Sequence, residues 1–126
     1  MDVNGLTRSV IGACIEVHRE MGPGLLESVY EECLATEFEL RGIPYQRQQA
    51  INLEYKGRRL ESEFRLDFFI NKTVILELKT VDRLLPIHEA QVLSYLRLTN
   101  SRIGLLINFK TPLLKNGIKR LANNYQ

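Results

Sequence analysis

Three charged side chains, Asp67, Glu77 and Lys79, interrupt two strongly apolar segments of the chain. Asp67 lies within residues 64–70, and the other two lie within residues 74–79. Both segments have the composition of strands in the interior of a sheet. Ionised groups are costly in such a place unless they are paired, hydrogen bonded or bound to a cation. These three residues are therefore the first candidates for chemistry.

The spacing of the two segments predicts which side chains face each other. A hairpin whose loop has an odd number of residues pairs Ile70 with Val74 and therefore Asp67 with Glu77. At about 4 Å and an effective dielectric constant near 20, two carboxylates repel each other by about 4 kcal/mol. A shared proton, a neighbouring cation or a metal ion must offset this repulsion. Lys79 lies on the same strand face as Glu77, and a hard divalent cation such as Mg²⁺ or Mn²⁺ would complete the neutralisation. The alternative is a surface pair of Lys79 with Glu77 beside a solvated Asp67.

Hydrophobic periodicity predicts the elements that hold these residues. It indicates helices over about 5–20, 26–41 and 87–99, and strands over about 51–55, 60–70, 74–79 and 103–109. The even-numbered residues from Leu60 to Ile70 are expected on one face of their strand. Residues 118–122 form either a short strand or a helical turn. The order α-α-β-β-β-α-β predicts an α/β fold, with a mixed central sheet flanked by helices, in a single domain over residues 1–126.

Composition limits the class of protein. The 126 residues are 44% hydrophobic and 25% charged, as in an ordinary globular protein. No apolar run approaches the roughly 18 residues of a membrane span. The first residues contain no uninterrupted apolar stretch, so we expect no secretory signal and a cytoplasmic location. Cys14 and Cys33 have no partners at metal-ligand spacing and are expected to be buried, reduced thiols.

Charge is unevenly distributed along the chain. Residues 1–63 hold seven basic and eleven acidic residues, whereas residues 64–126 hold ten and four. The basic second half could face a phosphate backbone, with Lys110, Lys115, Lys119 and Arg120 near its end as candidates for contact with phosphates. A solvated surface of mixed charge explains the same pattern, and both interpretations stay open.

The arrangement of Asp67 and Glu77-x-Lys79 on consecutive strands resembles that of the PD-(D/E)XK nuclease superfamily. Gln91 and Tyr95 match the Q-x-x-x-Y motif of its RecB-like branch. The resemblance implies a restriction-endonuclease-like core, a divalent metal ion and hydrolysis of phosphodiester bonds in nucleic acids.

A further motif, Gly24-x-x-Glu27-x-x-Tyr30, matches the signature of the small GxxExxY proteins within that branch. The similarity to these proteins runs from about residue 6 to residue 122. One position departs from the superfamily pattern, because Leu66 rather than proline precedes Asp67.

The resemblance implies a role for each matching residue. Asp67 and Glu77 would bind the metal ion, with the Leu78 carbonyl as a further ligand. Glu27 would join them directly, through a water or through a second ion. Lys79 would orient the attacking water, help to deprotonate it or stabilise the charge that develops on the phosphate. Glu27 has an alternative role as an acidic residue that stabilises a helix N-terminus.

Gln91 and Tyr95 lie four residues apart on one helix face and would position phosphate or support the metal ligands. Core packing is the alternative for Tyr95 and the expectation for Tyr30. His18 and His88 are expected to be packed or solvated rather than part of a site.

Three functions fit these residues. The first is a metal-dependent nuclease acting on DNA or RNA. The second is a binding module that keeps the fold and the metal pocket but cuts nothing unaided. The third is hydrolysis of a small phosphorylated molecule. No separate DNA-binding element is apparent, which leaves room for a homodimer or a protein partner that holds the substrate.

Overall fold

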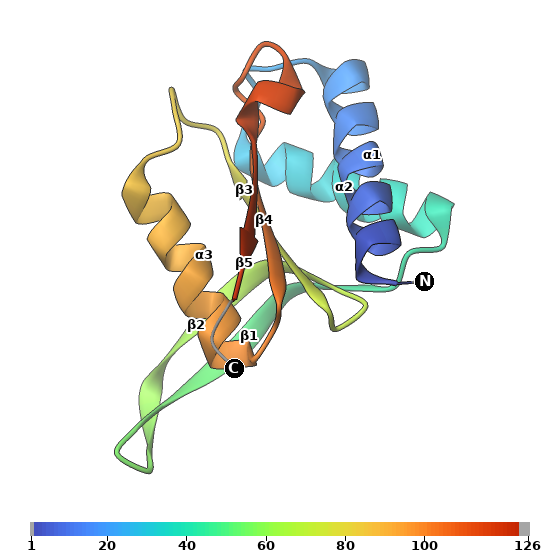
Figure 1. The fold of residues 1–126 in the computed structure, drawn as a ribbon. Coiled ribbons are helices and arrows are strands. Elements are labelled where there is room, and N and C mark those ends of the chain that lie inside the picture. Colours follow the sequence, from blue (N-terminus) through green and yellow to red (C-terminus); the bar gives the residue numbers. More distant parts are fainter. Residues whose placement is uncertain (1, 124–126) are drawn as a thin grey trace.

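A five-stranded mixed sheet forms the centre of the structure (Figure 1). The structure is a computed structural model that describes residues 2–123. β3 and β4 are parallel, and the other neighbouring strands are antiparallel. The strands lie side by side in chain order: β1 (Tyr45–Tyr55), β2 (Arg58–Ile70), β3 (Val74–Lys79), β4 (Ile103–Asn108) and β5 (Ile118–Ala122).

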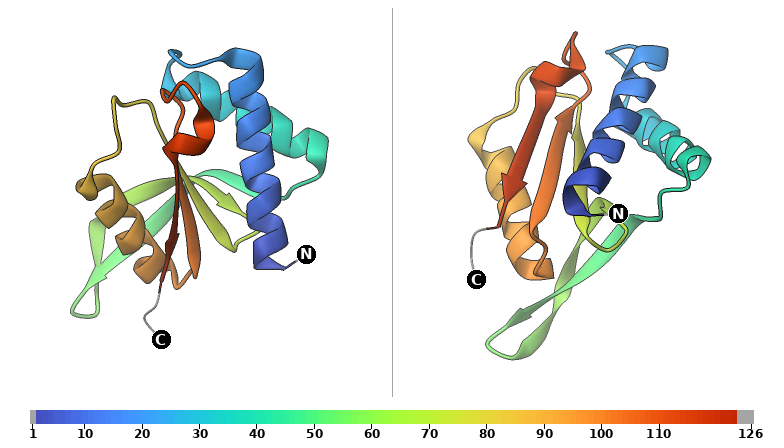
Figure 2. Two further views of the ribbon diagram at one scale, coloured as in Figure 1. Left: turned by 45° about the horizontal axis from the view of Figure 1, so that its top comes forward. Right: turned by 45° about the vertical axis from the view of Figure 1, so that its right-hand side comes forward.

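Three helices cover the two faces of this sheet (Figure 2). α1 (Val3–Met21) and α2 (Glu27–Arg41) pack on one face, and α3 (Pro86–Thr99) packs on the other. Each face has its own hydrophobic cluster: Phe68 and Leu76 lie under α1 and α2, whereas Ile75 and Leu106 lie under α3. The predicted α/β fold, with its order α-α-β-β-β-α-β and its mixed sheet between helices, is confirmed.

Local signals explain where the helices begin and end. The Asp2 side chain accepts a hydrogen bond from the Gly5 N–H at 2.6 Å and caps α1. Gly42 ends α2 in the left-handed conformation, with a φ of 68°, as its position in the sequence predicts. At the contact between α3 and β4, Gly104 allows close packing, because a Cβ there would lie 2.7 Å from Val92 Cγ1.

β2 does not keep one face toward one set of helices, and the prediction that it does is wrong. Phe64 and Leu66 pack in the cluster under α3, whereas Phe68 and Ile70 pack in the cluster under α1 and α2. The strand therefore changes sides at the intervening residue, Asp67. The cause lies in both neighbouring strands: Gln48 of β1 has a φ of 53° and interrupts the β1 ladder, and the β3 ladder ends at Phe68.

The bounds of most elements agree with the predicted ones to within two residues, and β1 differs most. β1 begins at Tyr45, six residues before the alternating pattern that predicted it. The chain after β4 forms a short 3-10 helix, η1 (Leu114–Gly117), and residues 118–122 form β5 rather than a helical turn. Among residues 2–123, no helix has the length and apolarity needed to cross a membrane.

Both cysteines are free thiols. Cys14 is fully buried, and burial raises its pKa to about 12. Cys33 is half-buried against the same cluster. The prediction of buried thiols is therefore confirmed for Cys14, whereas Cys33 is only half-buried.

Candidate active site

Asp67 and Glu77 lie side by side at the point where β2 and β3 stop pairing. The ladder joins Ile70 to Val74 and ends at Phe68 and Leu76, so the predicted register is confirmed. At the next position, the Glu77 carboxylate accepts a hydrogen bond from the Asp67 N–H at 2.7 Å. The Asp67 carboxylate accepts one from the Leu78 N–H at 2.8 Å. These reciprocal bonds take one oxygen of each carboxylate, and the Glu77 Oε1 atom accepts no hydrogen bond from any residue within 2–123.

Burial raises the pKa values of both carboxyl groups. Glu77 is only 7% exposed, and burial together with the charge of Asp67 raises its pKa to about 8. The Asp67 N–H and the Lys79 ammonium oppose this rise without cancelling it. Burial also raises the pKa of Asp67, against the hydrogen bond from the Leu78 N–H. Without a further cation, the pair therefore holds a proton at neutral pH, which offsets the repulsion that the register creates.

Lys79 supplies positive charge without a direct ion pair. It follows Glu77 on the α3 side of β3, and it takes part in none of the ion pairs found among residues 2–123. Its charge lowers the pKa values of Glu27, Asp67 and Glu77. The alternative of a solvated Asp67 beside a surface pair is therefore wrong, because Glu77 is buried and Asp67 is partly buried.

Asn108 fixes the backbone that follows Lys79, although it was not singled out from the sequence as a site residue. It pairs with Lys79 across β3 and β4 and is only 2% exposed. Its side chain accepts a hydrogen bond from the Val81 N–H at 3.1 Å and donates one to the Val81 carbonyl at 2.8 Å. A buried amide that bonds both polar groups of one residue holds the end of the strand in place.

The Gly24-x-x-Glu27-x-x-Tyr30 motif has a structural explanation. Gly24 has a φ of 99°, a conformation that favours glycine. The Tyr30 hydroxyl donates to the Gly22 carbonyl and accepts from the Leu25 N–H at 3.1 Å. Tyr30 thereby ties the loop before α2 to the core, where its ring stacks on Phe109 with centroids 4.5 Å apart. Tyr30 is fully buried, as predicted.

Glu27 is the first residue of α2, and the tied loop fixes its position. Burial raises its pKa first of all, followed by the charge of Asp67, while Lys79 lowers it. Glu27 is therefore close enough to these charges to interact with them. It also lies in the first turn of α2, so its predicted alternative role at the helix N-terminus applies as well.

Glu31 and Gln48 join this environment although neither was singled out from the sequence. Glu31 follows Glu27 by one helical turn and forms an ion pair with Arg47 at 2.9 Å. The Gln48 amide donates to Glu31 and lies 3.5 Å from Asp67 Oδ1. The four-residue spacing of Glu27 and Glu31 could have revealed the first, whereas nothing in the sequence indicates the left-handed conformation of Gln48.

The two α3 residues differ in their relation to the carboxylates. The Tyr95 ring stacks on Phe64, with centroids 4.4 Å apart. Burial raises the pKa of Tyr95, and so do the charges of Glu77 and Asp67, so its hydroxyl lies within their electrostatic reach. Gln91 is exposed one turn earlier on the helix and makes none of the hydrogen bonds found among residues 2–123.

The histidines have structural roles, in line with expectation. His18 is buried, and its Nε2 atom lies 2.9 Å from the Thr111 carbonyl oxygen. His88 accepts a hydrogen bond from the Leu85 N–H at 2.9 Å and caps the start of α3.

The candidate phosphate-binding lysines lie at different distances from the carboxylates. Lys119 is the nearest by register, because Glu77, Leu106 and Lys119 follow one another across β3, β4 and β5 and share a face. Two strand spacings separate Lys119 from Glu77, which is about 10 Å. Lys110 forms an exposed ion pair with Asp82 at 2.6 Å, and Lys115 is exposed in η1.

The oxygen atoms around Asp67 and Glu77 provide only part of the ligands that a hard cation needs. Asp67 and Glu77 offer carboxylate oxygens, which Mg²⁺ and Mn²⁺ prefer. The Leu78 carbonyl points to the same strand edge as its N–H, which already bonds Asp67. Residues 2–123 contain no group of three or more His, Cys, Asp or Glu side chains arranged to hold a metal ion. The two carboxylates are therefore the centre of any such metal site, and Glu27 would contribute to it through the electrostatic effect of its charge.

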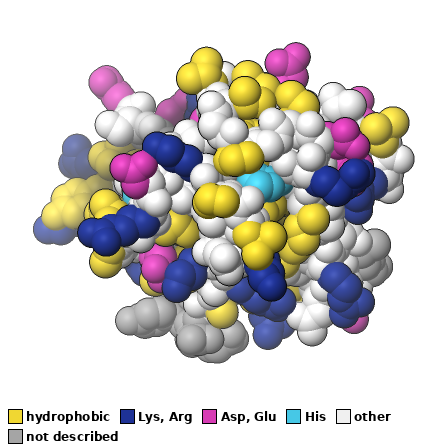
Figure 3. All heavy atoms as spheres, turned by 90° about the horizontal axis from the view of Figure 1, so that it is seen from above, with side chains coloured by type: hydrophobic (Ala, Val, Ile, Leu, Met, Phe, Trp, Pro, Cys, Tyr) yellow, Lys and Arg dark blue, Asp and Glu magenta, His cyan; other side chains and the backbone are white. Residues whose placement is uncertain are grey.

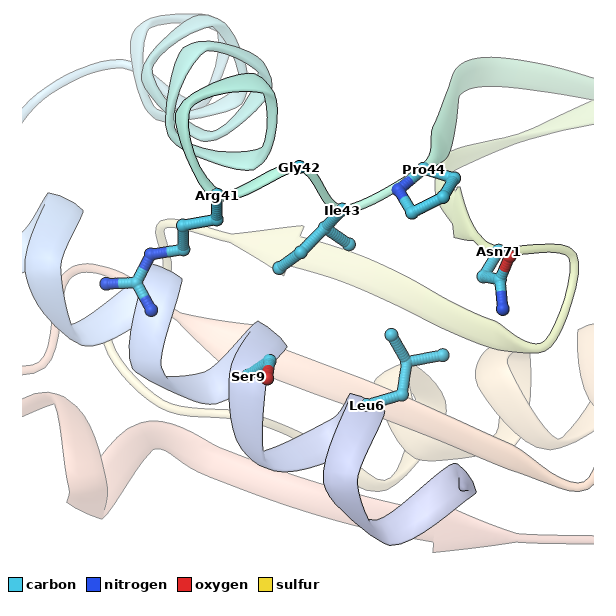
Figure 4. A pocket seen from close by; sticks show the side chains of 7 residues that line it. All are labelled: Leu6, Ser9, Arg41, Gly42, Ile43, Pro44 and Asn71. Atoms are coloured by element: carbon cyan, nitrogen blue, oxygen red, sulfur yellow. The ribbon is translucent and has the colours of Figure 1, made fainter. Parts of the chain in front are cut away.

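A cavity of about 450 Å³ lies elsewhere, between α1 and the connection from α2 to β1 (Figure 4). It is lined by residues that include Leu6, Arg41, Pro44 and Asn71, and none of the candidate site residues contributes to it. Its charged group, the Arg41 guanidinium, is already paired with Glu37 at 2.6 Å. The residues that line the cavity include no carboxylate, which a metal-dependent site would need.

Comparison with known proteins identifies a family to which the chain is similar. A family model described as the PD-(D/E)XK nuclease superfamily matches residues 4–121. No curated protein and no solved structure gives a significant match. The matched range contains every candidate site residue discussed above.

Proposed function

Because the chain belongs to the PD-(D/E)XK nuclease superfamily, we propose that it is a metal-dependent nuclease that cleaves DNA or RNA at the Asp67–Glu77 pair. The observation that carries this proposal is the pair itself, two carboxylates held together against their mutual repulsion by reciprocal bonds to the backbone. A structural role does not require a buried acid in contact with a second, partly buried one. We further propose that the chain belongs to the GxxExxY branch, because it carries the Gly24-x-x-Glu27-x-x-Tyr30 motif.

In this proposal the residues of the site divide into two groups. Asp67, Glu77 and the Leu78 carbonyl bind Mg²⁺ or Mn²⁺, and Glu27 supports them directly or through water. A bound ion supplies positive charge to the phosphate and lowers the pKa of water. Lys79 orients the attacking water and stabilises the negative charge that develops on the phosphate.

The residues of α3 and the basic tail would hold the substrate. Tyr95 and Gln91 present polar groups from one helix face and position the phosphate. Lys119, on the same sheet face as Glu77, contacts the neighbouring backbone, and Lys110 and Lys115 extend this contact.

A cleavage assay tests the proposal. Wild-type protein with Mg²⁺ or Mn²⁺ is expected to cleave at least one of single-stranded DNA, duplex DNA, single-stranded RNA and duplex RNA. Lys79→Ala should lower the rate by about 100-fold or more, because it removes a group that acts on the transition state. Lys72→Ala is the matched control: this lysine lies in the exposed turn before β3, at the opposite end of the strand from Lys79.

Two outcomes would contradict the proposal. One is the absence of cleavage on all four substrates with both ions. The other is a rate that Lys79→Ala and Lys72→Ala change equally. Cleavage that does not depend on polymer length would instead indicate a small phosphorylated molecule as the substrate.

One observation favours a second function, that of a binding module that needs a partner to cut. Residues 2–123 hold two acids in contact rather than a complete set of three ligands. Binding of nucleic acid and metal without cleavage, followed by cleavage when cell extract is added, would support this function over the first.

A further inference from the structure

The β1–β2 hairpin projects from the body of the molecule as a two-stranded ribbon (Figures 1 and 2). Its outer part, residues 54–61, is exposed throughout. Lys56 and Gly57 form its turn, both with positive φ, as a tight two-residue turn requires. An exposed ribbon of this kind gains little stability from its own contacts, so its length suggests a role outside the core.

The two faces of the ribbon carry different charges. The register pairs Tyr55 with Arg58 and Glu54 with Arg59, and paired residues share a face. Asn52 pairs with Glu63, and the register shifts by two residues between Asn52 and Glu54. A shift by two keeps the alternation of faces, so Glu63 joins the Arg59 face. Tyr55 and Arg58 are thus on the face opposite to these acids.

The face of Tyr55 and Arg58 continues the α3 side of the sheet. Ile51 points to the same side of β1 as Tyr55, and it packs in the cluster under α3. Glu77 and Lys79 alternate with Ile75, another member of that cluster, and so lie on this side too. The ribbon face and the candidate active site are therefore open to the same side of the sheet.

We propose that this face of the ribbon, formed by Tyr55, Arg58 and the turn residue Lys56, binds the backbone of a nucleic-acid duplex about 26 Å from the carboxylates. The inference rests on the proposed nuclease function for the identity of its ligand. Arg47 pairs with Phe68 and Gln49 with Leu66, so Gln48 lies opposite Asp67. Eight residues of β1 separate Gln48 from Lys56, and at about 3.3 Å each they span about 26 Å. A duplex rises about 3.4 Å per base pair, so about eight base pairs are needed to reach from the carboxylates to the turn.

The chemistry of the face suits a duplex. Arg58 and Lys56 supply positive charge for phosphates, and Glu54 and Glu63 lie on the other side, where they do not repel them. The Lys56 ammonium lies 5.4 Å from the centroid of the Tyr55 ring, which is 62% exposed. The Tyr55 hydroxyl, like the Lys and Arg side chains beside it, can donate a hydrogen bond to a phosphate oxygen. A two-stranded ribbon also has the width that a major groove admits.

The end of the sheet seen in Figure 3 does not offer an equivalent surface. On that face, Lys and Arg side chains are interspersed with acidic and hydrophobic ones and form no continuous basic surface. A duplex held only at that end would meet mixed charges, whereas the ribbon provides a separate contact.

Binding in EDTA tests the inference without cleavage. Fluorescence anisotropy would compare duplexes of about 24 base pairs with stem-loops whose stem has about six base pairs, in DNA and in RNA, because only the longer duplexes reach from the carboxylates to the ribbon. Arg58→Ser and Tyr55→Ser are each expected to weaken binding of the longer duplex by about fivefold to tenfold. The matched control is Arg59→Ser, which removes the same charge from the opposite face and should change binding by less than about twofold. Binding of the stem-loops should change little in all three variants.

Several results would overturn the inference. They are the absence of duplex binding by the wild type, equal losses in Arg58→Ser and Arg59→Ser, and a wild-type dimer that Arg58→Ser converts to monomers in sedimentation. The last result would make a second copy of the chain the occupant of this face. Cleavage by a protein whose duplex binding ignores Arg58 would overturn this inference alone. Binding through Arg58 without cleavage would support it and contradict the nuclease proposal.

Discussion

At the scale of single residues, the candidate site is defined by two neighbouring carboxylates and by the groups that offset their repulsion. Asp67 and Glu77 are brought into contact by the hairpin register, and each accepts a hydrogen bond from the other's strand. Lys79 lowers both pKa values, but the pKa of Glu77 stays at about 8. The site therefore lacks positive charge at neutral pH, which is the condition that a divalent cation would relieve.

This conflict predicts how stability depends on pH. In the folded protein the pKa of Glu77 is about 8, above its ordinary value of 4.5. The stabilising contribution of the neutral carboxyl group is therefore fully present below about pH 4.5 and is lost as pH rises through about 8. Glu77→Gln keeps a neutral group at all pH values. In EDTA at about pH 8.5 it should exceed the wild type in unfolding free energy by at least about 1 kcal/mol.

Urea unfolding at several pH values measures this difference. The advantage of Glu77→Gln should shrink below about pH 5, where the wild-type carboxyl group is neutral as well. Glu61→Gln, an exposed change on β2, is the control and should follow the wild type. Parallel curves of unfolding free energy against pH for the wild type and Glu77→Gln would contradict the raised pKa of Glu77.

The residues of the site were predictable to different degrees. Asp67, Glu77 and Lys79 stood out because charges in apolar strands are rare, and hairpin spacing then gave their register. Gln48 and Asn108 were missed for a physical reason. Each acts through a backbone conformation or a hydrogen bond that composition and periodicity do not encode.

At the scale of elements, the loop before α2 and the twist of β2 place the acids. Tyr30 bonds both sides of the loop that precedes Glu27. β2 changes sides at Asp67, and beside this residue the pairing of β2 with β3 ends. The sequence predicted both elements but not this change, because alternating apolar residues indicate a strand without indicating where it twists.

The hydrogen bonds of the Tyr30 hydroxyl to the loop before α2 lead to a prediction about Tyr30→Phe. Tyr30→Phe keeps the buried ring but removes the hydroxyl, so it should lower the unfolding free energy by about 1 kcal/mol. It should also lower cleavage, because Glu27 loses its fixed position. Tyr45→Phe is the matched control, since it removes an exposed hydroxyl bonded to Glu39 at 2.7 Å. Chemical denaturation and the cleavage assay give the two readouts, and equal behaviour of the two variants would refute the role of the loop.

At the scale of the whole molecule, some basic residues of the second half already have partners. Lys110 is paired with Asp82, and Arg120 donates to the Asn4 side chain at 2.8 Å. Acids of the first half, such as Glu27 and Glu31, instead lie near Asp67. Counts of charge along the chain could not show this, because folding mixes the two halves around one sheet.

The measurement that tests the central claim most directly is metal binding by calorimetry. Mg²⁺ and Mn²⁺ would be titrated into the wild type, Asp67→Asn and the control Glu61→Gln. We predict binding of one ion to the wild type and the control at submillimolar to millimolar concentrations, and its loss in Asp67→Asn. Because a protonated Glu77 must release its proton, affinity should fall about tenfold per pH unit below about pH 8. No heat of binding at millimolar ion in folded protein, or unchanged binding in Asp67→Asn, would contradict the assignment of this site.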